Sequence, residues 1–232
     1  MARYLLRLDH ISKTFNKEDN AKIITVLDDI DFTVRQGEFV SILGPSGCGK
    51  STLLKIIAGL ILPTRGKCLY RGKPIAGPGL ERGYVFQDPR LFPWLTVLEN
   101  INLAGKDGHK LVKKMKLQDF SHALPHELSG GMARRAALAR ALAPKPDLLL
   151  LDEPFTNLDM PLRKELYNEL RQIWLEGVTC ILVTHDIDEA LELGTRLVLL
   201  KERPAVIRED REINSDKSNL KKEFLAWMEV GG

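Results

Sequence analysis

The chain alternates between short apolar runs and segments with apolar residues at helical spacing. The runs Phe39–Leu43, Leu148–Leu151 and Val178–Val183 are typical of strands buried on both faces, as in a parallel sheet. One helix is predicted to begin near Lys50, and another is predicted at Ala133–Ala143, which is rich in alanine, leucine and arginine. This alternation predicts an α/β fold built on a parallel sheet.

The N-terminal part of the chain is dominated by β-prone residues. Three short β-prone runs, Tyr4–Leu8, Ile23–Leu27 and Ile30–Val34, are separated by polar segments such as Asn16–Asn20. They predict β-structure in this part of the chain. Further short strands are predicted at Lys67–Tyr70 and Tyr84–Phe86.

A small helical lobe is predicted within the core, at about residues 88–140. Thr96 and Glu99 have the spacing of a capping box, which predicts a helix that begins there. Residues 105–125 are polar and rich in lysine, with helical spacing at Leu111, Met115 and Leu117. The whole chain, residues 1–232, is therefore expected to form one domain with this lobe inserted.

The C-terminal residues 205–232 are predicted to be a short extension. Arg196–Leu200 is expected to be the last strand. Ser218–Val230 has the pattern of an amphipathic helix that packs on the body. Its apolar stripe consists of Leu220, Phe224, Trp227 and Met228.

Composition limits the classes of function. Charged residues make up 28% and hydrophobic residues 44%, as in ordinary globular proteins, and a net charge of +3 does not favour nucleic acid as a partner. The three cysteines, Cys48, Cys68 and Cys180, lack metal-ligand spacing and favour a reducing compartment. No apolar run is long enough to span a bilayer, so a function at a membrane requires spans from another chain.

The strongest chemical signal is a glycine-rich loop between the predicted strand Phe39–Leu43 and the predicted helix at Lys50. Such a loop directs backbone N–H groups at phosphate oxygens, while Lys50 reaches the β- and γ-phosphates and Ser51 ligates Mg²⁺. The alternative is a strand–helix turn that binds nothing. The candidate phosphate-binding residues are Gly44, Pro45, Ser46, Gly47, Cys48, Gly49, Lys50, Ser51 and Thr52.

A second site suited to anions precedes the helix at Ala133–Ala143. Ser129, Gly130 and Gly131 place a hydroxyl and backbone N–H groups at its N-terminus. Two such sites in one chain indicate two phosphates, or one phosphate shared between two copies. The arginines in this helix, Arg134, Arg135 and Arg140, are each interpreted as part of a solvated basic face.

Two carboxylates follow the aliphatic strand Leu148–Leu151. Residues at the carboxyl ends of parallel strands face the ligand crevice, so Asp152 can hold Mg²⁺ and Glu153 can orient or deprotonate water. Alone, this pair is also compatible with a surface turn. Together with the glycine-rich loop, it predicts a site for nucleotide hydrolysis.

Two single residues are ambiguous by themselves. Phe15 can stack on a purine ring if it is exposed, but a lone phenylalanine is more often part of a core. His185 follows the predicted strand Val178–Val183 and can contact a phosphate, although a structural role is more common for such a histidine. Asp186 is predicted to cap the helix that runs through Leu193.

The order of three motifs resembles that of the ATP-binding cassette (ABC) ATPases. The motifs are Gly44–Thr52, Leu128–Met132 and Leu148–Pro154, and the resemblance covers about residues 4–205. It implies a P-loop NTPase core with an N-terminal antiparallel β-lobe and an inserted helical lobe. It also implies ATP hydrolysis with ATP and Mg²⁺ as cofactors.

The resemblance assigns roles to single positions. Phe15 matches the aromatic residue that stacks on adenine, and Asp159 matches the aspartate that links two subunits. The implied catalytic residues are Glu153, His185, Gln87 and Lys50, and the implied Mg²⁺ ligands are Ser51, Gln87 and Asp152.

The resemblance also implies partners. Two cassettes pair head to tail in this family, so that Ser129 and Gly131 of one close on ATP held by the other. A membrane permease docks near Gln87, and an extracytoplasmic solute-binding protein completes such a system. The implied location is peripheral, at the cytoplasmic face of the cell membrane, and no nucleic-acid partner is expected.

Local matches indicate a subfamily. Met132 replaces the usual glutamine, and the segment between Gln87 and Ser129 is shorter than usual. Met132, Phe92–Val97 and Arg203-Pro204 are similar to the cassettes of nitrate, sulfonate, taurine and bicarbonate importers. The alternatives are a non-transport ABC ATPase, the ATPase of a separate-chain exporter, or another P-loop enzyme such as a small-molecule kinase.

Overall fold

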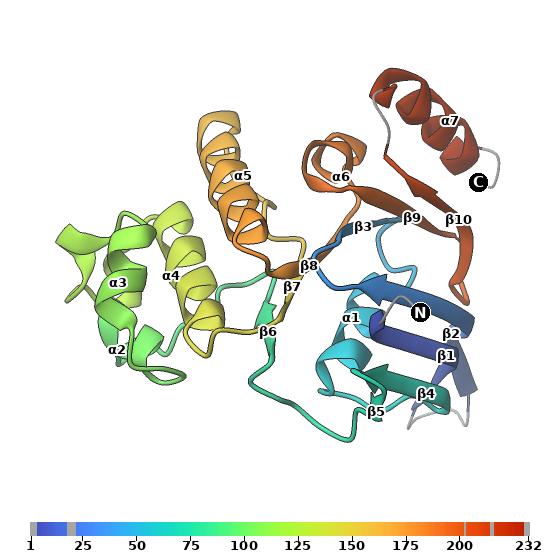
Figure 1. Ribbon diagram of the computed structural model, residues 1–232, viewed down its shortest axis with the longest axis horizontal. Helices are drawn as coiled ribbons and strands as arrows, with labels where there is room; N and C mark the ends of the chain where they lie inside the picture. The colour runs from blue at the N-terminus through green and yellow to red at the C-terminus, as the bar shows by residue number, and fades with distance from the viewer. Residues whose placement is uncertain (1–3, 18–21, 202, 214–215, 230–232) are drawn as a thin grey trace. The chain divides into compact units, whose positions relative to one another are not determined.

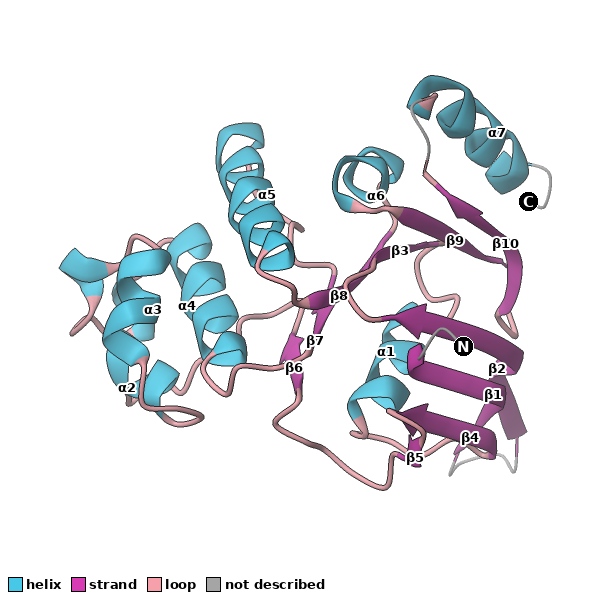
Figure 2. Ribbon diagram, in the orientation of Figure 1, coloured by secondary structure: helices cyan, strands magenta, loops and turns pink. Residues whose placement is uncertain are grey.

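The computed structural model describes residues 4–17, 22–201, 203–213 and 216–229. The chain divides into two compact units, residues 1–79 with 179–232 and residues 80–178. Figure 1 identifies the elements, and Figure 2 shows that each unit contains both helices and strands.

The first unit contains an antiparallel sheet. Its strands β1 (Tyr4–Lys17), β2 (Lys22–Arg35), β4 (Arg65–Tyr70) and β5 (Lys73–Pro74) pair in the order β2-β1-β4-β5. The prediction of an antiparallel β-lobe is therefore confirmed. The two predicted runs in residues 23–34 form one strand, because register shifts in its pairing with β1 absorb the polar residues between them. Residues 18–21, which include most of the predicted polar break, lie outside the described residues.

The same unit contains β3 (Phe39–Leu43), β8 (Thr179–Thr184), β9 (Arg196–Lys201) and β10 (Val206–Glu212), hydrogen-bonded in the order β10-β9-β3-β8. Strand β3 runs parallel to both β8 and β9, and every residue of β3 and β8 is buried. This confirms that their apolar runs are parallel strands with both faces covered.

The expectation that Arg196–Leu200 is the last strand is wrong. Strand β10 follows it and pairs antiparallel with β9. Most of the β10 residues are charged, so the sequence lacks the apolar pattern of a strand. Strand β10 lies at the edge of the sheet, where backbone hydrogen bonds to β9 hold it although none of its residues is buried.

Helix α1 (Lys50–Ala58) begins at the predicted position, and helix α6 (Ile187–Leu193) begins and ends where it is predicted to. Gly59 ends α1 in the left-handed conformation, and the Asp186 side chain caps α6 by accepting hydrogen bonds from two backbone amides.

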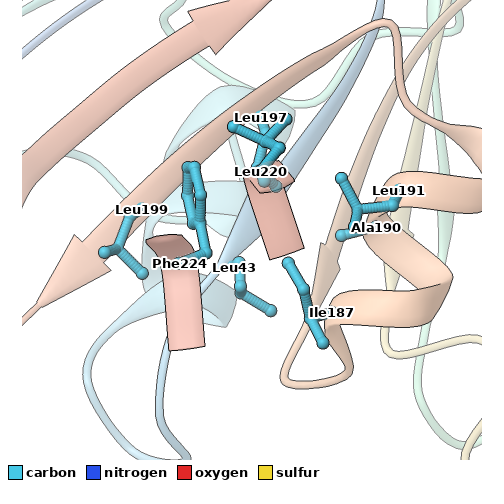
Figure 3. Close-up of a cluster of buried hydrophobic side chains, with 8 residues drawn as sticks. All are labelled: Leu43, Ile187, Ala190, Leu191, Leu197, Leu199, Leu220 and Phe224. Carbon is cyan, nitrogen blue, oxygen red and sulfur yellow. The ribbon is translucent and has the colours of Figure 1, made fainter. Parts of the chain in front are cut away.

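Helix α7 (Lys217–Glu229) packs on the body, as predicted. Leu220 and Phe224 are buried in one cluster with Leu43 and Ile187, and Figure 3 shows these side chains directed toward one another. The side chains of Trp227 and Met228 lie outside the described residues. The remaining members of this cluster are Ala190, Leu191, Leu197 and Leu199.

The second unit combines two parallel strands with a series of helices. Strands β6 (Arg82–Val85) and β7 (Leu148–Asp152) pair in register, with Val85 opposite Leu151. Thr96 and Glu99 form the predicted capping box of the first helix. The helical elements are α2 (Val97–Asn102), α3 (Gly108–Lys114), η1 (Gln118–Phe120), η2 (Pro125–Glu127), α4 (Gly130–Leu142) and α5 (Met160–Leu175).

Helices α2, α3 and α4 lie between β6 and β7 in sequence. Val112, Met115 and Leu117 are buried, whereas Leu111 is only partly covered, so the buried face differs slightly from the predicted one. The boundaries predicted for the helical lobe, about 88–140, remain a prediction.

The interpretation of the α4 arginines as a solvated basic face is wrong. Arg135 is 9% exposed and forms ion pairs with Glu165 and Glu169. Arg140 donates hydrogen bonds to the carbonyl oxygens of Pro89 and Arg90, at 3.0 and 2.7 Å. Long arginine side chains can cross a packed helix surface to reach such acceptors, which a helical pattern alone does not show.

The burial of Phe224 predicts a measurable contribution of α7 to stability. We expect Phe224→Ala to lower the free energy of unfolding by about 3 to 5 kcal/mol, because it removes a fully buried aromatic side chain. Urea denaturation measures this change. The matched control is Leu225→Ala, at a neighbouring side chain that is 37% exposed, and it is expected to stay within about 0.5 kcal/mol of the parent. Equal effects of the two substitutions would show that α7 does not pack through Phe224.

Candidate nucleotide-binding and hydrolysis site

The glycine-rich loop joins β3 to α1, as the sequence predicts. Gly47 and Gly49 have positive φ angles of 77° and 126°, a region that favours glycine. A Cβ atom on Gly49 would lie 2.9 Å from the Leu27 side chain and 3.1 Å from the Val26 carbonyl oxygen. The loop conformation thus requires glycine at this position for both its backbone angle and its close contacts.

Lys50 lies inside the curve of this loop. Its side chain donates hydrogen bonds from Nζ to the carbonyl oxygens of Gly44 and Pro45, at 2.8 and 2.9 Å, and the residue is 4% exposed. The ammonium group is therefore held against the loop. Residues 45–47 are exposed at its tip, Cys48 is buried beneath it, and Ser51 and Thr52 are partly exposed in the first turn of α1.

Strand pairing places His185 at the same edge as the loop. Leu43 and Thr184 are paired residues at the ends of parallel strands β3 and β8, so Gly44 and His185 both leave the sheet there. His185 is exposed rather than part of the core. The adjacent Thr184 hydroxyl donates a 2.5 Å hydrogen bond to the buried Glu189 carboxylate, which fixes the end of β8.

Phe15 projects from β1 and is 41% exposed, so the interpretation of a core phenylalanine is wrong. The ammonium group of Lys13 lies 4.9 Å from the centre of its ring. An exposed ring face is what stacking on a purine requires. That role remains a prediction.

The second unit holds the acidic residues. Asp152 ends β7 and is 5% exposed, and the Tyr84 hydroxyl donates a 2.7 Å hydrogen bond to its Oδ2 atom. Gln87 follows β6, and its Nε2 atom lies 3.5 Å from Oε2 of Glu153. Because β6 and β7 are parallel and in register, Gln87 and Glu153 leave neighbouring strand ends together. The predicted grouping of these residues is thus present within this unit.

Glu153 has an uncommon backbone conformation, with φ at +45°. The next residues form a turn in which the amide and hydroxyl of Thr156 both donate to the carbonyl oxygen of Glu153, at 3.4 and 3.1 Å. Non-glycine residues in this region are strained and are concentrated at functional sites. The sequence contains no signal for this feature, since glutamate has no special preference for the conformation.

Ser129 and Gly130 present the N-terminus of α4 at the surface. Ser129 is the N-cap, and its Oγ accepts a hydrogen bond from the Met132 amide at 3.3 Å. Gly131 is buried, and a Cβ atom on it would lie 2.2 Å from Leu162 Cδ2. The exposed part of the predicted anion site therefore consists of Ser129 and Gly130, while Gly131 permits close packing against α5.

Asp159 caps helix α5. Its Oδ1 accepts a 3.1 Å hydrogen bond from the Leu162 amide, and the residue is exposed. The predicted contact between Asp159 and a second subunit is a separate role, and it remains a prediction.

Arg134 connects the loops that carry the candidate catalytic residues. Its guanidinium donates to the carbonyl oxygen of Gln87 at 3.0 Å and also to the carbonyl oxygen of Thr156. Burial lowers the pKa of Arg134 from its ordinary value, while nearby Asp88 opposes that shift. Sequence reasoning missed this residue, because its acceptors are backbone atoms distant in sequence.

The side chains present are suited to Mg²⁺ and a triphosphate. The Ser51 hydroxyl, the Gln87 amide oxygen and the Asp152 carboxylate are hard oxygen ligands of the kind Mg²⁺ prefers. The loop curves around the Lys50 ammonium group, which donates hydrogen bonds to the carbonyl oxygens of Gly44 and Pro45. A buried carboxylate and a loop of this form fit the predicted cofactors, although their roles remain predictions.

Comparison with known proteins identifies the family. The ABC transporter family matches residues 27–156. The chain belongs to this family. As an ABC cassette, it binds and hydrolyses ATP, and the predicted P-loop core with a β-lobe and a helical lobe is confirmed.

Two relatives and one solved structure define the similarity. The aliphatic sulfonates import ATP-binding protein SsuB of Bacillus cereus is 42% identical over 243 residues, covering 97% of this chain and 96% of the relative. The taurine import ATP-binding protein TauB of Pelagibacter ubique is 43% identical over 217 residues, covering 87% and 82%. The ATP-binding cassette MJ0796, in a dimeric post-hydrolysis state bound to ADP and Pi, has a TM-score of 0.81 and 31% identity, covering 90% of this chain and 99% of that one.

The length and polarity of the helices determine whether any of them could cross a membrane. Across the part of the chain that the structure describes, every helix is too short or too polar to cross a bilayer.

The two hydrogen bonds of Arg134 predict a local effect on both loops. We expect Arg134→Ala to speed hydrogen exchange in residues 86–90 and in residues 154–159, because it releases the Gln87 and Thr156 carbonyl groups together. Hydrogen bonds to charged groups contribute about 1.5 to 3 kcal/mol each, so exchange in these segments should rise by at least about tenfold.

Lys113→Ala removes an exposed cation of the same unit and is the control. It should leave exchange in both segments unchanged. Faster exchange in only one segment of Arg134→Ala would contradict a shared anchor.

Proposed function

We propose that this cassette powers import of a small anionic solute through a separate membrane permease. The observation that carries the proposal is the similarity over nearly the whole chain to an importer cassette, at 42% identity. Relatives named for sulfonate and taurine import support a solute of that class. Met132 and Phe92–Val97 favour the same subfamily, which includes nitrate importers. The system also contains an extracytoplasmic solute-binding protein under this proposal.

ATP hydrolysis in this proposal depends on the acidic end of β7. Glu153 accepts a proton from the water that attacks the γ-phosphate, and Gln87, 3.5 Å from that carboxylate, helps to orient the water. Lys50 and His185 contact the phosphates. Bound Mg²⁺ supplies positive charge that stabilises the phosphoryl group in transfer.

A second cassette completes each ATP site in this proposal. Ser129 and Gly130 are exposed at the N-terminus of the 13-residue helix α4, which favours anions. Ser129 and Gly130 close on ATP held by the partner cassette. Gly131, beside them, allows α4 to pack closely against α5. Asp159 lies near the boundary between the two subunits. The dimeric state of MJ0796 with ADP and Pi supports this arrangement.

The permease docks on an aromatic surface after Gln87. Phe92 and Trp94 are 41% and 70% exposed, and their rings lie 5.5 Å apart. Fully buried Asn100 holds their loop through hydrogen bonds with the Phe92 amide and three carbonyl oxygens. Rigid exposed aromatic residues are typical of binding sites. This contact holds the cassette at the cytoplasmic face of the membrane.

The role of Glu153 predicts trapping of a nucleotide-bound dimer. We expect Glu153→Gln to bind ATP–Mg²⁺ without turning it over, because glutamine cannot accept the proton. Analytical ultracentrifugation should show a shift from the 26.1 kDa monomer toward twice that mass when ATP–Mg²⁺ is added.

The double variant Lys50→Ala with Glu153→Gln should remain monomeric, since it lacks the phosphate-binding ammonium group. Glu192→Gln, at an exposed carboxylate of α6, should keep the parental ATPase rate. Turnover of Glu153→Gln at the parental rate would exclude Glu153 as the base. A monomer with bound ATP would contradict ATP-driven pairing of this chain with itself.

A second variant tests the proposed permease-docking surface formed by Phe92 and Trp94. We expect Trp94→Ala to weaken binding to the permease by about 2 kcal/mol or more, as truncation of a central aromatic contact does. The measurement is the share of cassette that pellets with membranes from cells expressing the whole transporter. Leu62→Ala, at a 56% exposed side chain of the other unit, should pellet as the parent does. Unchanged pelleting of Trp94→Ala would remove this surface from the permease contact.

A further inference from the structure

We propose that Tyr84 is a positioning residue for the Asp152 carboxylate, holding one of its oxygens so that the other is directed to the Mg²⁺ shell. This inference rests on the proposed role of Asp152 as a metal ligand. Tyr84 itself is assigned no contact with ATP or Mg²⁺.

The strand register brings the two side chains together. Tyr84 on β6 is paired with Leu150 on the parallel strand β7. Paired residues point to the same face of a sheet, and residues two apart on a strand share a face, so Tyr84 and Asp152 lie on one side. The tyrosine ring spans the remaining distance, and its hydroxyl donates to Oδ2 of Asp152 at 2.7 Å.

Surrounding side chains fix the tyrosine. The ring of Phe86 lies 4.3 Å from the ring of Tyr84, tilted by 43°, and the Arg90 guanidinium lies 4.4 Å from the centre of the Phe86 ring. A tyrosine hydroxyl keeps its proton at neutral pH, so it donates the hydrogen bond to the Asp152 carboxylate.

The orientation of the Asp152 carboxylate matters for metal binding because Asp152 is buried. At 5% exposure its carboxylate has little access to solvent, so the orientation of the group depends on protein donors. A hydrogen bond from a phenol to a carboxylate is charge-assisted and stronger than a neutral one. Mg²⁺ requires near-ideal octahedral geometry, and loss of a partner that orients a metal ligand typically weakens metal binding by about 10- to 100-fold.

Tyr84→Phe is the test, because it removes only the hydroxyl oxygen and keeps the ring. We expect the Mg²⁺ dissociation constant of the ATP-bound protein to rise about 10- to 100-fold, measured by calorimetric titration in the Glu153→Gln background. ATP binding in EDTA should be unchanged. With Glu153 intact, the Mg²⁺ concentration for half-maximal ATPase activity should rise, while excess Mg²⁺ restores most of the rate.

The matched control is Tyr167→Phe, which alters a tyrosine of the same unit whose ring contacts Phe155 edge-on. It should leave Mg²⁺ binding unchanged. A Tyr84→Phe variant with parental Mg²⁺ affinity would overturn the proposal. So would an equal loss of ATP binding with and without the metal, because that result indicates a general structural role.

Asp152→Asn separates this inference from the proposed function. If Asp152→Asn weakens Mg²⁺ binding and Tyr84→Phe does not, only the role of Tyr84 is wrong. If neither variant changes Mg²⁺ binding, the assignment of Asp152 as a metal ligand is wrong, and the inference about Tyr84 is wrong with it.

Discussion

The parallel pairing of β3 with β8 is the constraint on which the placement of the glycine-rich loop beside His185 depends. With Leu43 opposite Thr184, the glycine-rich loop and His185 emerge at one edge of the sheet. Both strands are fully buried, so a slip of one residue would turn each side chain to the opposite face and separate the two groups. The geometry of these candidate site residues and the packing of the core are therefore fixed by the same hydrogen bonds.

The candidate acidic residues of the other unit are organised by the same principle. The register of β6 and β7 places Tyr84 against Asp152 and Gln87 beside Glu153. Arg134 then fixes the backbone on both sides of these residues. The candidate catalytic groups are thus held by neighbouring side chains, as precise positioning requires.

Much of the fold and most candidate site residues could be predicted, because glycine loops, capping residues and aliphatic strands leave local patterns in a sequence. The start of α1 and the Thr96 capping box are examples. Features that depend on contacts distant in sequence could not be predicted. Strand β10 is held by pairing with β9 despite its charges, and the bonds of Arg134 and Tyr84 exist only once the chain is folded. The conformation of Glu153 likewise follows from the turn after it.

The position of β3 between β8 and β9 in the sheet has a consequence for biosynthesis. Its neighbours β8 and β9 and the covering helix α7 all come from the last part of the chain. While the ribosome is still making the middle of the protein, the strand before the phosphate-binding loop has neither hydrogen-bonding neighbour. Such an apolar strand with open edges is prone to association with other chains. Nascent or prematurely terminated cassettes should therefore depend on chaperones and be unable to bind ATP until the C-terminal strands are released.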